Sequence, residues 1–105
     1  MNKYNAKKTE VNGIIFDSMK EANRYCQLLL MVKTGIISDL ETQPRYDIVH
    51  NGVKVCFYKA DFRYMQDGAI VVEDVKGCKK GAAYSMFRLK KKLVKAFHGV
   101  EVIEI

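Results

Sequence analysis

Two segments of the chain repeat apolar residues at the three- and four-residue spacing that is typical of amphipathic helices. The first helix is predicted from Ser18 to about Thr34, with Gly35 as its stop, and its apolar face would hold Ala22, Tyr25, Cys26, Leu29 and Val32. The second is predicted from about Ala83 to Phe97, with an apolar face of Met86, Leu89, Leu93, Ala96 and Phe97. Each helix is therefore expected to pack one face against a neighbouring layer.

Three two-residue turn signals separate runs of β-prone residues, and such signals predict hairpins. They are Asn12-Gly13, Asn51-Gly52 and Asp67-Gly68. The resulting registers would place Val11 opposite Ile14, His50 opposite Val53, and Gln66 opposite Ala69. The segments at about 40–50, 53–66 and 69–76 should then form an antiparallel meander.

Two further features complete the predicted fold. Pro44 cannot donate a ladder hydrogen bond, so its strand is expected to lie at an edge or to contain a bulge. After Gly99, alternating β-branched residues predict a short closing strand. The predicted order is α, β, β, β, α, β in a single α/β (α+β) domain over residues 1–105, with residues 1–8 expected to be poorly ordered.

Composition narrows the class of protein. An apolar fraction of 49% with 29% charged residues is typical of a globular domain, and no apolar run approaches the ~20 residues of a membrane span. The N-terminal residues lack the apolar stretch of a secretory signal, so a cytoplasmic location without membrane contact is expected. Cys26, Cys56 and Cys78 are odd in number and lack CxxC spacing, which predicts free thiols.

A net charge of +6 favours a polyanionic partner, because lysine and arginine release counterions when they bind phosphates. Part of this charge follows the polar side of the second predicted helix, as a stripe of Arg88, Lys91, Lys92 and Lys95. Phosphate contact is one interpretation of the stripe. A merely solvated helix face is the alternative.

The third hairpin brings two acids together. If Gln66 faces Ala69, then Asp61 lies directly opposite Asp74, and two facing carboxylates normally need a cation or a raised pKa. Alternation along the strands predicts a polar face formed by Lys59, Asp61, Arg63, Asp74 and Lys76, and a core face formed by Tyr58, Ala60, Phe62, Tyr64, Val71 and Val75. Ordinary surface charges paired with lysines are the competing interpretation. Glu73 would share this site only if a bulge shifted the register by one residue.

The residues Asp61 and Asp74-Val75-Lys76, together with the predicted element order, resemble the D…(D/E)-x-K signature and αβββαβ core of the PD-(D/E)XK nuclease superfamily. The segments KKTEVNGIIFDSMKEANRY, ADFRY and VVEDVKG resemble small phage and prophage endonuclease-like proteins. The resemblance implies a restriction-endonuclease-like fold, with a mixed sheet flanked by helices, in the host cytoplasm if a phage encodes the chain. Ala60 stands where the motif has proline, a variation that the superfamily often shows.

The resemblance also implies a metal site. Glu21, at the start of the first helix, would be the third acid, although Ser18-Met19-Lys20-Glu21 is also a capping box in which Glu21 only bonds the backbone. Mg²⁺ or Mn²⁺ would bind Asp61, Asp74, the Val75 carbonyl and Glu21, as one ion or two, with Glu73 as second choice. The ion would activate water and stabilise charge on the phosphate, helped by Lys76.

These expectations describe a structure-selective DNA endonuclease that acts on branched, flapped or nicked DNA in phage replication, recombination or packaging, in the manner of a Holliday junction resolvase. Further contacts to DNA are expected from Lys59, Arg63, Lys79 and Lys80, and Gln43 would line the same cleft. Cutting both strands would require two sites, and hence a symmetric homodimer. The alternatives are a non-catalytic nucleic-acid-binding module and a phage protein that uses a nuclease fold to bind a host protein.

Overall fold

Three tight turns organise the strands of the protein. The computed structural model describes residues 8–77 and 79–105. Each Asn-Gly or Asp-Gly turn has both residues at positive φ, from 51° at Asn51 to 79° at Gly13, which is the backbone that two-residue hairpins require. The hairpins are β1 (Thr9–Val11) with β2 (Ile14–Phe16), β4 (Arg45–His50) with β5 (Val53–Lys59), and β6 (Phe62–Gln66) with β7 (Ala69–Asp74). All three predicted registers are confirmed at the turns: Val11 pairs with Ile14, His50 with Val53, and Gln66 with Ala69.

The two helices begin and end within one residue of their predicted limits. Helix α1 (Met19–Lys33) is capped by Ser18, whose Oγ accepts a hydrogen bond from the Glu21 N–H at 3.1 Å. Helix α2 (Ala82–His98) ends at Gly99, which has the left-handed φ of 69° common after a helix. Local sequence signals therefore account for both ends of α1 and for the end of α2, whereas α2 begins after Gly81 without a side-chain cap.

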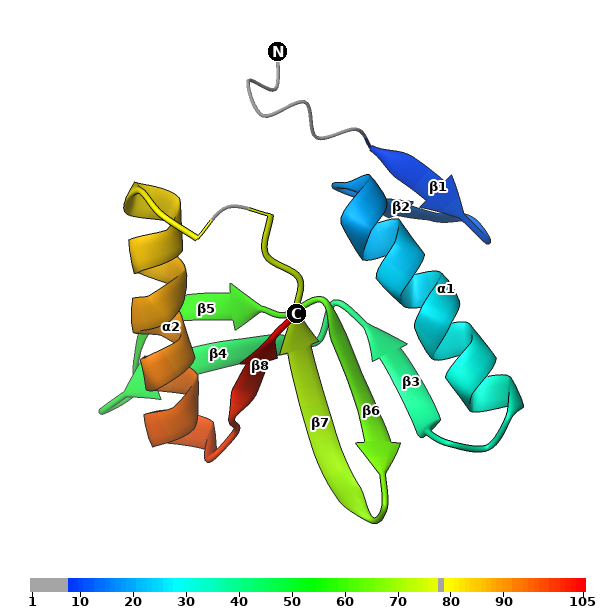
Figure 1. Cartoon of the computed structure of the whole chain (residues 1–105). Helices are drawn as coiled ribbons and strands as arrows, with labels where there is room; N and C mark the ends of the chain where they lie inside the picture. Colours follow the sequence, from blue (N-terminus) through cyan, green and yellow to red (C-terminus); the bar gives the residue numbers. More distant parts are fainter. Residues whose placement is uncertain (1–7, 78) are drawn as a thin grey trace.

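A four-stranded sheet separates the two helices (Figure 1). Its order is β3 (Ser38–Thr42), β6, β7 and β8 (Val102–Glu104), with β8 parallel to β7 and the other neighbours antiparallel. Two apolar clusters lie on opposite faces of this sheet, because neighbouring side chains of a strand alternate. The cluster under α1 contains Phe16, Tyr25, Leu28, Phe62, Tyr64 and Val75. The cluster under α2 contains Ile48, Tyr58, Ala60, Val72, Phe87, Val94 and Val102.

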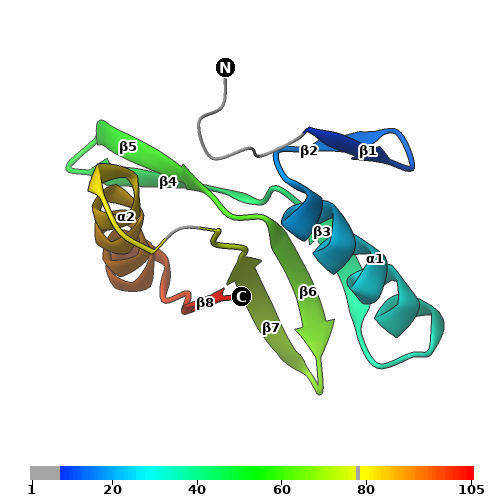
Figure 2. The same ribbon diagram turned by 45° about the horizontal axis from the view of Figure 1, so that its top comes forward.

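The predicted meander is interrupted by a bend. The segment at 40–50 breaks at Gln43–Pro44 into β3 and β4, and the segment at 53–66 breaks at Ala60–Asp61 into β5 and β6. Pairing continues through the break, because the Gln43 N–H donates to the Asp61 carbonyl at 2.9 Å and the Ala60 N–H donates to the Pro44 carbonyl at 3.0 Å. Beyond the break, β4 and β5 form a two-stranded ribbon, called here the arm (residues 45–59), which leaves the main sheet (Figure 2). As expected from Pro44, β3 is an edge strand.

The bend corrects one assignment of side chains to faces. Tyr58 and Ala60 were expected on the same face as Phe62 and Tyr64, but they belong to the cluster under α2. The break in the strand at Ala60–Asp61 ends the simple alternation on which that expectation relied. Val71 and Val75 do lie with Phe62 and Tyr64, as predicted.

The buried faces of the helices also differ from the prediction. In α1, Leu28 is buried, whereas Cys26 is exposed and Val32 is 37% exposed. In α2, the buried residues are Phe87 and Val94, while the expected core residues Met86, Leu89 and Phe97 are 53%, 52% and 43% exposed. Helix α2 carries two adjacent apolar stripes, and its contacts with the arm select the one containing Phe87 and Val94.

The structure bears on two expectations from composition, the free cysteines and the absence of a membrane span, but only for the residues that it describes. Cys26 and Cys56 are free thiols, as predicted, whereas Cys78 and the N-terminal residues 1–7 lie outside the described residues. In the part of the chain that is described, neither helix is long and apolar enough to cross a membrane.

Candidate functional site

Asp61 and Asp74 lie side by side where the arm joins the main sheet. The β6–β7 register runs without a shift from Gln66 to Phe62, and the Asp61 N–H then donates to the Glu73 carbonyl at 3.1 Å. The Asp61 Oδ2 accepts a hydrogen bond from the Val75 N–H at 2.6 Å, and the two carboxyl groups are themselves in hydrogen-bond contact. The hairpin thus brings together the pair of acids that its turn predicts.

Asp74 is buried rather than solvent-facing. It is 5% exposed, because the α2 side of the sheet is covered by its own apolar cluster. The Tyr58 hydroxyl donates to the Asp74 Oδ2, and the Lys76 Nζ lies 3.0 Å from the Asp74 Oδ1 and 3.9 Å from the centre of the Phe87 ring. The prediction that one face of the sheet is polar and the other forms the core is therefore wrong: both faces form core, Asp74 is buried in it, and Asp61 is half-buried at its edge.

Burial and mutual repulsion change the proton affinity of this pair. Burial, followed by the negative charge of Asp74, raises the pKa of Asp61 to about 8, against the lowering effect of the Val75 N–H. Burial and the hydrogen bond to Asp74 also raise the pKa of the Tyr58 hydroxyl, so this group remains a donor. At neutral pH the pair therefore holds a proton between its carboxyl groups unless a cation replaces it.

Glu21 stands near this pair and also caps its own helix. Burial raises the pKa of Glu21, with further contributions from the charges of Asp17 and Asp74, and Glu21 in turn raises the pKa of Asp61. The Ser18 Oγ accepts from the Glu21 N–H, which is one half of a capping box, but the Glu21 carboxylate bonds the Asp17 backbone and the Ser18 side chain in place of the Ser18 backbone. Both interpretations of Glu21 thus have a basis in its contacts. Within residues 8–77 and 79–105, no three His, Cys, Asp or Glu side chains are grouped closely enough to hold a metal ion. Glu21 is therefore near the acid pair without forming a three-acid group with it.

Glu73 points to the opposite face of the sheet and has its own partners. Its side chain is 1% exposed and forms a two-pronged ion pair with Arg24, from Nε at 2.8 Å and from Nη2 at 2.7 Å. The Tyr64 hydroxyl donates to Glu73 at 2.5 Å. Because the register has no shift here, Glu73 stays under α1, separate from Asp61 and Asp74.

Lys76 is held in place by backbone contacts as well as by Asp74. The Lys20 Nζ donates to the carbonyl oxygens of Lys76 and Ile105, at 2.7 and 3.2 Å, and the Lys76 N–H donates to the Ile105 carbonyl at 3.2 Å. The start of α1, the end of β7 and the residue after β8 thus meet at this point. Sequence reasoning missed Lys20, although its position one residue before Glu21 was a usable signal.

Three other supporting residues were also missed. Arg24 follows Glu21 by three positions, so it lies on the same side of α1, and this spacing could have identified it. Tyr58 and Tyr64 had no comparable signal, because their hydroxyl partners depend on the bend and on the side of the sheet that each helix covers.

Comparison with known proteins adds a family to this geometry. A family model described as "Protein of unknown function (DUF1064)" matches residues 1–102. The chain belongs to the DUF1064 family. Searches of curated proteins and of solved structures returned no match.

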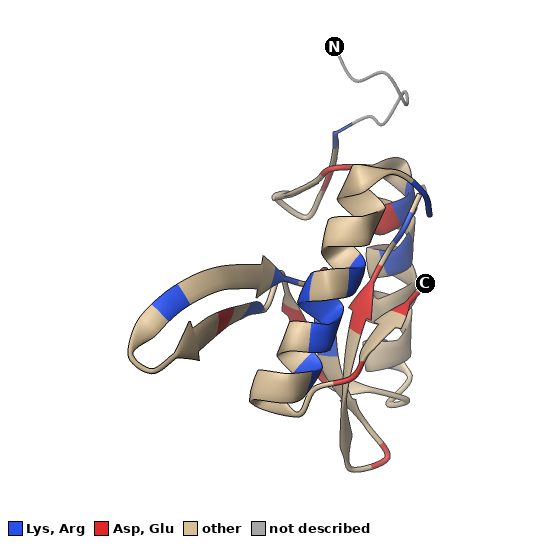
Figure 3. Ribbon diagram, turned by 90° about the vertical axis from the view of Figure 1, so that its left-hand side faces the viewer, with Lys and Arg blue, Asp and Glu red and all other residues tan. Residues whose placement is uncertain are grey.

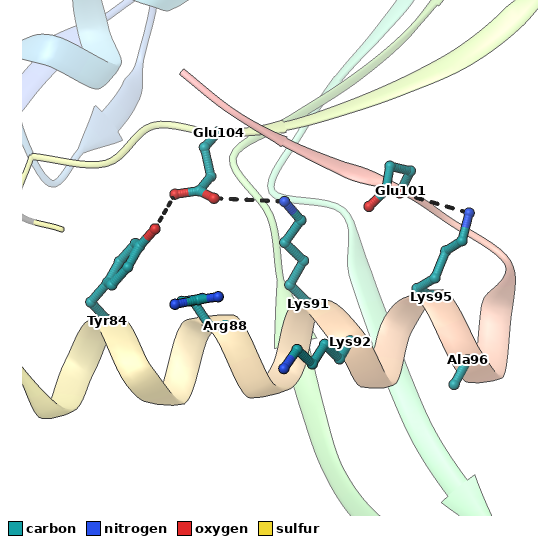
Figure 4. Close-up of a pocket in the computed structure, with 8 residues that line it drawn as sticks. All are labelled: Tyr84, Arg88, Lys91, Lys92, Lys95, Ala96, Glu101 and Glu104. Atoms are coloured by element: carbon teal, nitrogen blue, oxygen red, sulfur yellow. Dashed lines mark hydrogen bonds and ion pairs between the residues drawn. The ribbon is translucent and has the colours of Figure 1, made fainter. Parts of the chain in front are cut away.

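In this DUF1064 protein, the predicted basic stripe of α2 lines a surface pocket of about 390 Å³ between α2 and the C-terminal strand (Figure 4). Two of the four cations have acidic partners across the pocket. The Lys91 Nζ lies 3.6 Å from the Glu104 carboxylate, and the Lys95 Nζ lies 3.8 Å from the Glu101 carboxylate. Arg88 and Lys92 also line the pocket. The stripe is thus continuous, but part of its charge is already neutralised.

The remaining candidates lie around the bend. Lys59 is exposed at the end of β5, and Gln43 is exposed beside the Asp61 backbone with a left-handed φ of 54°. Arg63 is partly buried, 3.6 Å from the Glu41 carboxylate, and Lys79 and Lys80 are exposed between β7 and α2. Lys59 is thus two residues before Asp61 in the chain, and Gln43 is the neighbour of Asp61 across the strands.

Proposed function

We propose that this DUF1064 protein is a metal-dependent nuclease of the PD-(D/E)XK type that hydrolyses phosphodiester bonds in DNA. The observation that carries the proposal is the pair formed by half-buried Asp61 and buried Asp74, with Lys76 held 3.0 Å from Asp74. Two acids next to each other in a protein interior are costly unless a proton or a cation separates them. Groups whose pKa is displaced by burial and by a specific charged neighbour occur most often at functional sites.

The donor set suits a hard divalent cation such as Mg²⁺ or Mn²⁺. Asp61 and Asp74 offer carboxylate oxygens, the Val75 carbonyl lies between Asp74 and Lys76 in the chain, and Glu21 is within electrostatic reach of Asp61. When bound, such an ion supplies activation of water and stabilisation of the charge that develops on a phosphate. The cation would also offset the burial and the charge of Asp74 that together raise the pKa of Asp61.

The other groups around the pair orient it. The Val75 N–H holds the Asp61 Oδ2, and the Tyr58 hydroxyl and the Lys76 Nζ hold the Asp74 Oδ2 and Oδ1, so a bound cation would share the Asp74 oxygens with these two groups. Lys76 places an ammonium group beside Asp74, with its position defined by the Phe87 ring and by the backbone contact with Ile105. An ammonium in this position can neutralise charge on a phosphate or orient the attacking water.

The arrangement of elements also supports the proposal. If the bent segments at 38–50 and 53–66 are each counted as one strand, the order after the first hairpin is α, β, β, β, α, β, with the last strand parallel to β7. The restriction-endonuclease-like core has this order; Asp74 ends β7, and Asp61 lies at the bend directly before β6. A module that only bound phosphates would gain nothing from two carboxyl groups in contact with each other.

A cleavage assay tests the proposal. The purified protein is incubated with Mg²⁺, Mn²⁺ or a chelator on linear duplex, single-stranded, flapped, nicked and four-way DNA, and we expect metal-dependent cuts that are most frequent on the branched, flapped or nicked substrates. Asp74→Asn should abolish cleavage, while Glu10→Gln, which removes an exposed acid from β1, should leave it unchanged. DNA binding without cleavage of any substrate would favour a non-catalytic binding module. Absence of both would favour a protein partner.

A further inference from the structure

The outer face of the arm carries an aromatic ring among positive charges. Cross-strand partners share a face, so this face is formed by Arg45, Asp47 and Val49 of β4 and by Lys54, Phe57 and Lys59 of β5. The opposite face, with Ile48, Cys56 and Tyr58, packs against α2. Phe57 is 40% exposed and Val49 is 49% exposed. The arm therefore presents a surface that its own fold does not cover.

Cations surround the Phe57 ring from three elements. The Arg45 Cζ lies 4.0 Å from the ring centre, the Lys90 Nζ of α2 lies at 5.4 Å, and the Lys54 Nζ lies at 5.7 Å. One acid offsets them, since Asp47 lies 3.0 Å from Arg45 and 3.7 Å from Lys54. With Lys59 on the same face, four cations face one carboxylate, so the surface is positive.

This surface also leads to the acid pair. Phe57 and Lys59 belong to the strand that runs through Ala60 directly into Asp61. Figure 3 shows the arm projecting from the body of the protein, with basic positions along it and along α2. Four residues of extended chain span at most about 13 Å, so a strand of nucleic acid bound to this face could continue to the acid pair.

We propose that the outer face of the arm binds a single-stranded segment of DNA, with Phe57 stacked on an unpaired base and Arg45, Lys54, Lys59 and Lys90 in contact with flanking phosphates. The inference rests on the proposed nuclease function and specifies its substrate as DNA with unpaired bases. An exposed aromatic ring among cations is the combination by which proteins hold single strands. A duplex offers no free base face to the ring, and a second copy of this face would bring like charges together.

Fluorescence provides a direct test, because the chain contains no tryptophan. Phe57→Trp introduces a single reporter on the arm, and the titration uses an oligodeoxythymidylate with a chelator present, so that cleavage is absent. We expect saturable quenching by the single strand and little change with a duplex of equal length. Emission that stays constant while anisotropy shows the oligonucleotide to be bound would overturn the proposal, as would absence of binding. Emission that changes with protein concentration alone would indicate self-association and overturn it as well.

A second variant separates stacking from apolar bulk. Phe57→Leu should weaken single-strand binding about tenfold or more, because a base loses its aromatic partner, while duplex binding changes little. Phe97→Leu is the matched control, since Phe97 is 43% exposed on α2 and should not affect binding. Equal single-strand affinities for Phe57→Leu and wild type would assign Phe57 to a structural role. Binding in chelator without cleavage in Mg²⁺ would contradict the nuclease alone, whereas cleavage without a response at Phe57 would contradict only the arm.

Discussion

Glu73 and Asp74 are consecutive residues of β7 that point to opposite faces of one sheet, and both are buried. Under α1, Glu73 accepts two hydrogen bonds from the Arg24 guanidinium and one from the Tyr64 hydroxyl, so its charge is balanced. Under α2, Asp74 meets a second carboxyl group, Asp61, with Lys76 as its cation. The first region is complete as it stands, while the second retains a need for a proton or a cation.

The comparison separates a buried charge that stabilises a fold from one that can perform chemistry. Burial is common to both acids, so burial by itself does not identify a site. The two acids differ in how their negative charge is balanced. Glu73 pairs with Arg24, 49 residues away in sequence, and this ion pair joins α1 to the sheet. Asp61 and Asp74 instead repel each other when both are charged. Without the shared proton, Asp61 and Asp74 carry two negative charges against the single ammonium of Lys76, and this excess is the feature that can attract a divalent ion.

The largest expected effect is on cleavage. Asp74→Asn and Lys76→Met should each reduce the cleavage rate about a thousandfold, because each removes a charge that acts on the phosphate or its metal. Asparagine is preferred over alanine at position 74, since alanine would leave the buried Tyr58 hydroxyl without its acceptor and destabilise the protein. Single-turnover cleavage measures the effect.

The matched control for this experiment lies on the other face. Glu73→Gln should retain cleavage per folded molecule, because Glu73 contacts Arg24 and Tyr64 instead of the acid pair. If Glu73 proved essential and Asp74 dispensable, the assignment of the two faces would be reversed.

The next effect is on stability. Arg24→Met should lower the free energy of unfolding by about 3 kcal/mol, because Glu73, at 1% exposure, would be left as an unpaired buried charge. The double variant Arg24→Met with Glu73→Gln should recover much of this loss, since the unpaired charge is then absent. Urea denaturation of the four proteins of this cycle measures the coupling. A loss below about 1 kcal/mol for the single variant would mean that the pair behaves as a surface salt bridge.

A smaller effect is the pH dependence of stability that titration of Asp61 produces. The pKa of Asp61 is higher in the folded state, about 8, than its ordinary value of 3.8, so the folded protein holds this proton more tightly than the unfolded chain. The stabilisation from Asp61 is therefore full below pH 4 and is lost as pH rises toward 8, by at most about 1.4 kcal/mol per pH unit. Asp61→Asn should remove this slope, because an amide does not titrate in this range. The fold should be retained, because the amide oxygen can still accept from the Val75 N–H. Thermal melts across pH without metal measure it.

Bound metal should stabilise the protein more as pH rises, which is opposite to the effect of the Asp61 proton. Because Mg²⁺ competes with the shared proton, its stabilisation of wild type should grow from pH 6 to pH 8 and be absent in Asp61→Asn. Equal metal-induced shifts in the melting temperature of both proteins would exclude Asp61 from the site.

The smallest effect concerns the basic stripe of α2. Arg88→Gln with Lys92→Gln should flatten the salt dependence of DNA binding by about one unit of slope for each phosphate that the variant no longer binds. Lys91→Gln with Lys95→Gln should change it less, because these lysines already contact Glu104 and Glu101. Cleavage at saturating DNA should survive in both. An unchanged slope in Arg88→Gln with Lys92→Gln would mean that the stripe does not contact DNA and is only a solvent-exposed helix face.

The sequence by itself determined the features that depend on neighbouring residues. The Asn-Gly and Asp-Gly turns require a particular local backbone, so the registers beside the turns follow from them, and in β6–β7, where no shift occurs, so does the meeting of Asp61 with Asp74. Both limits of α1 and the end of α2 follow from Ser18, Gly35 and Gly99 in the same way.

Tertiary structure decided what depends on contacts between distant segments. The bend beside Pro44 moves Tyr58 to the α2 side, where it reaches Asp74. Which stripe of α2 is buried depends on the arm, and the pairing of Glu73 with Arg24 depends on where α1 lies on the sheet. Hydrophobic periodicity cannot distinguish two adjacent apolar stripes, and local spacing does not show which buried acid will find a cation, because both outcomes are set by packing between elements far apart in the chain.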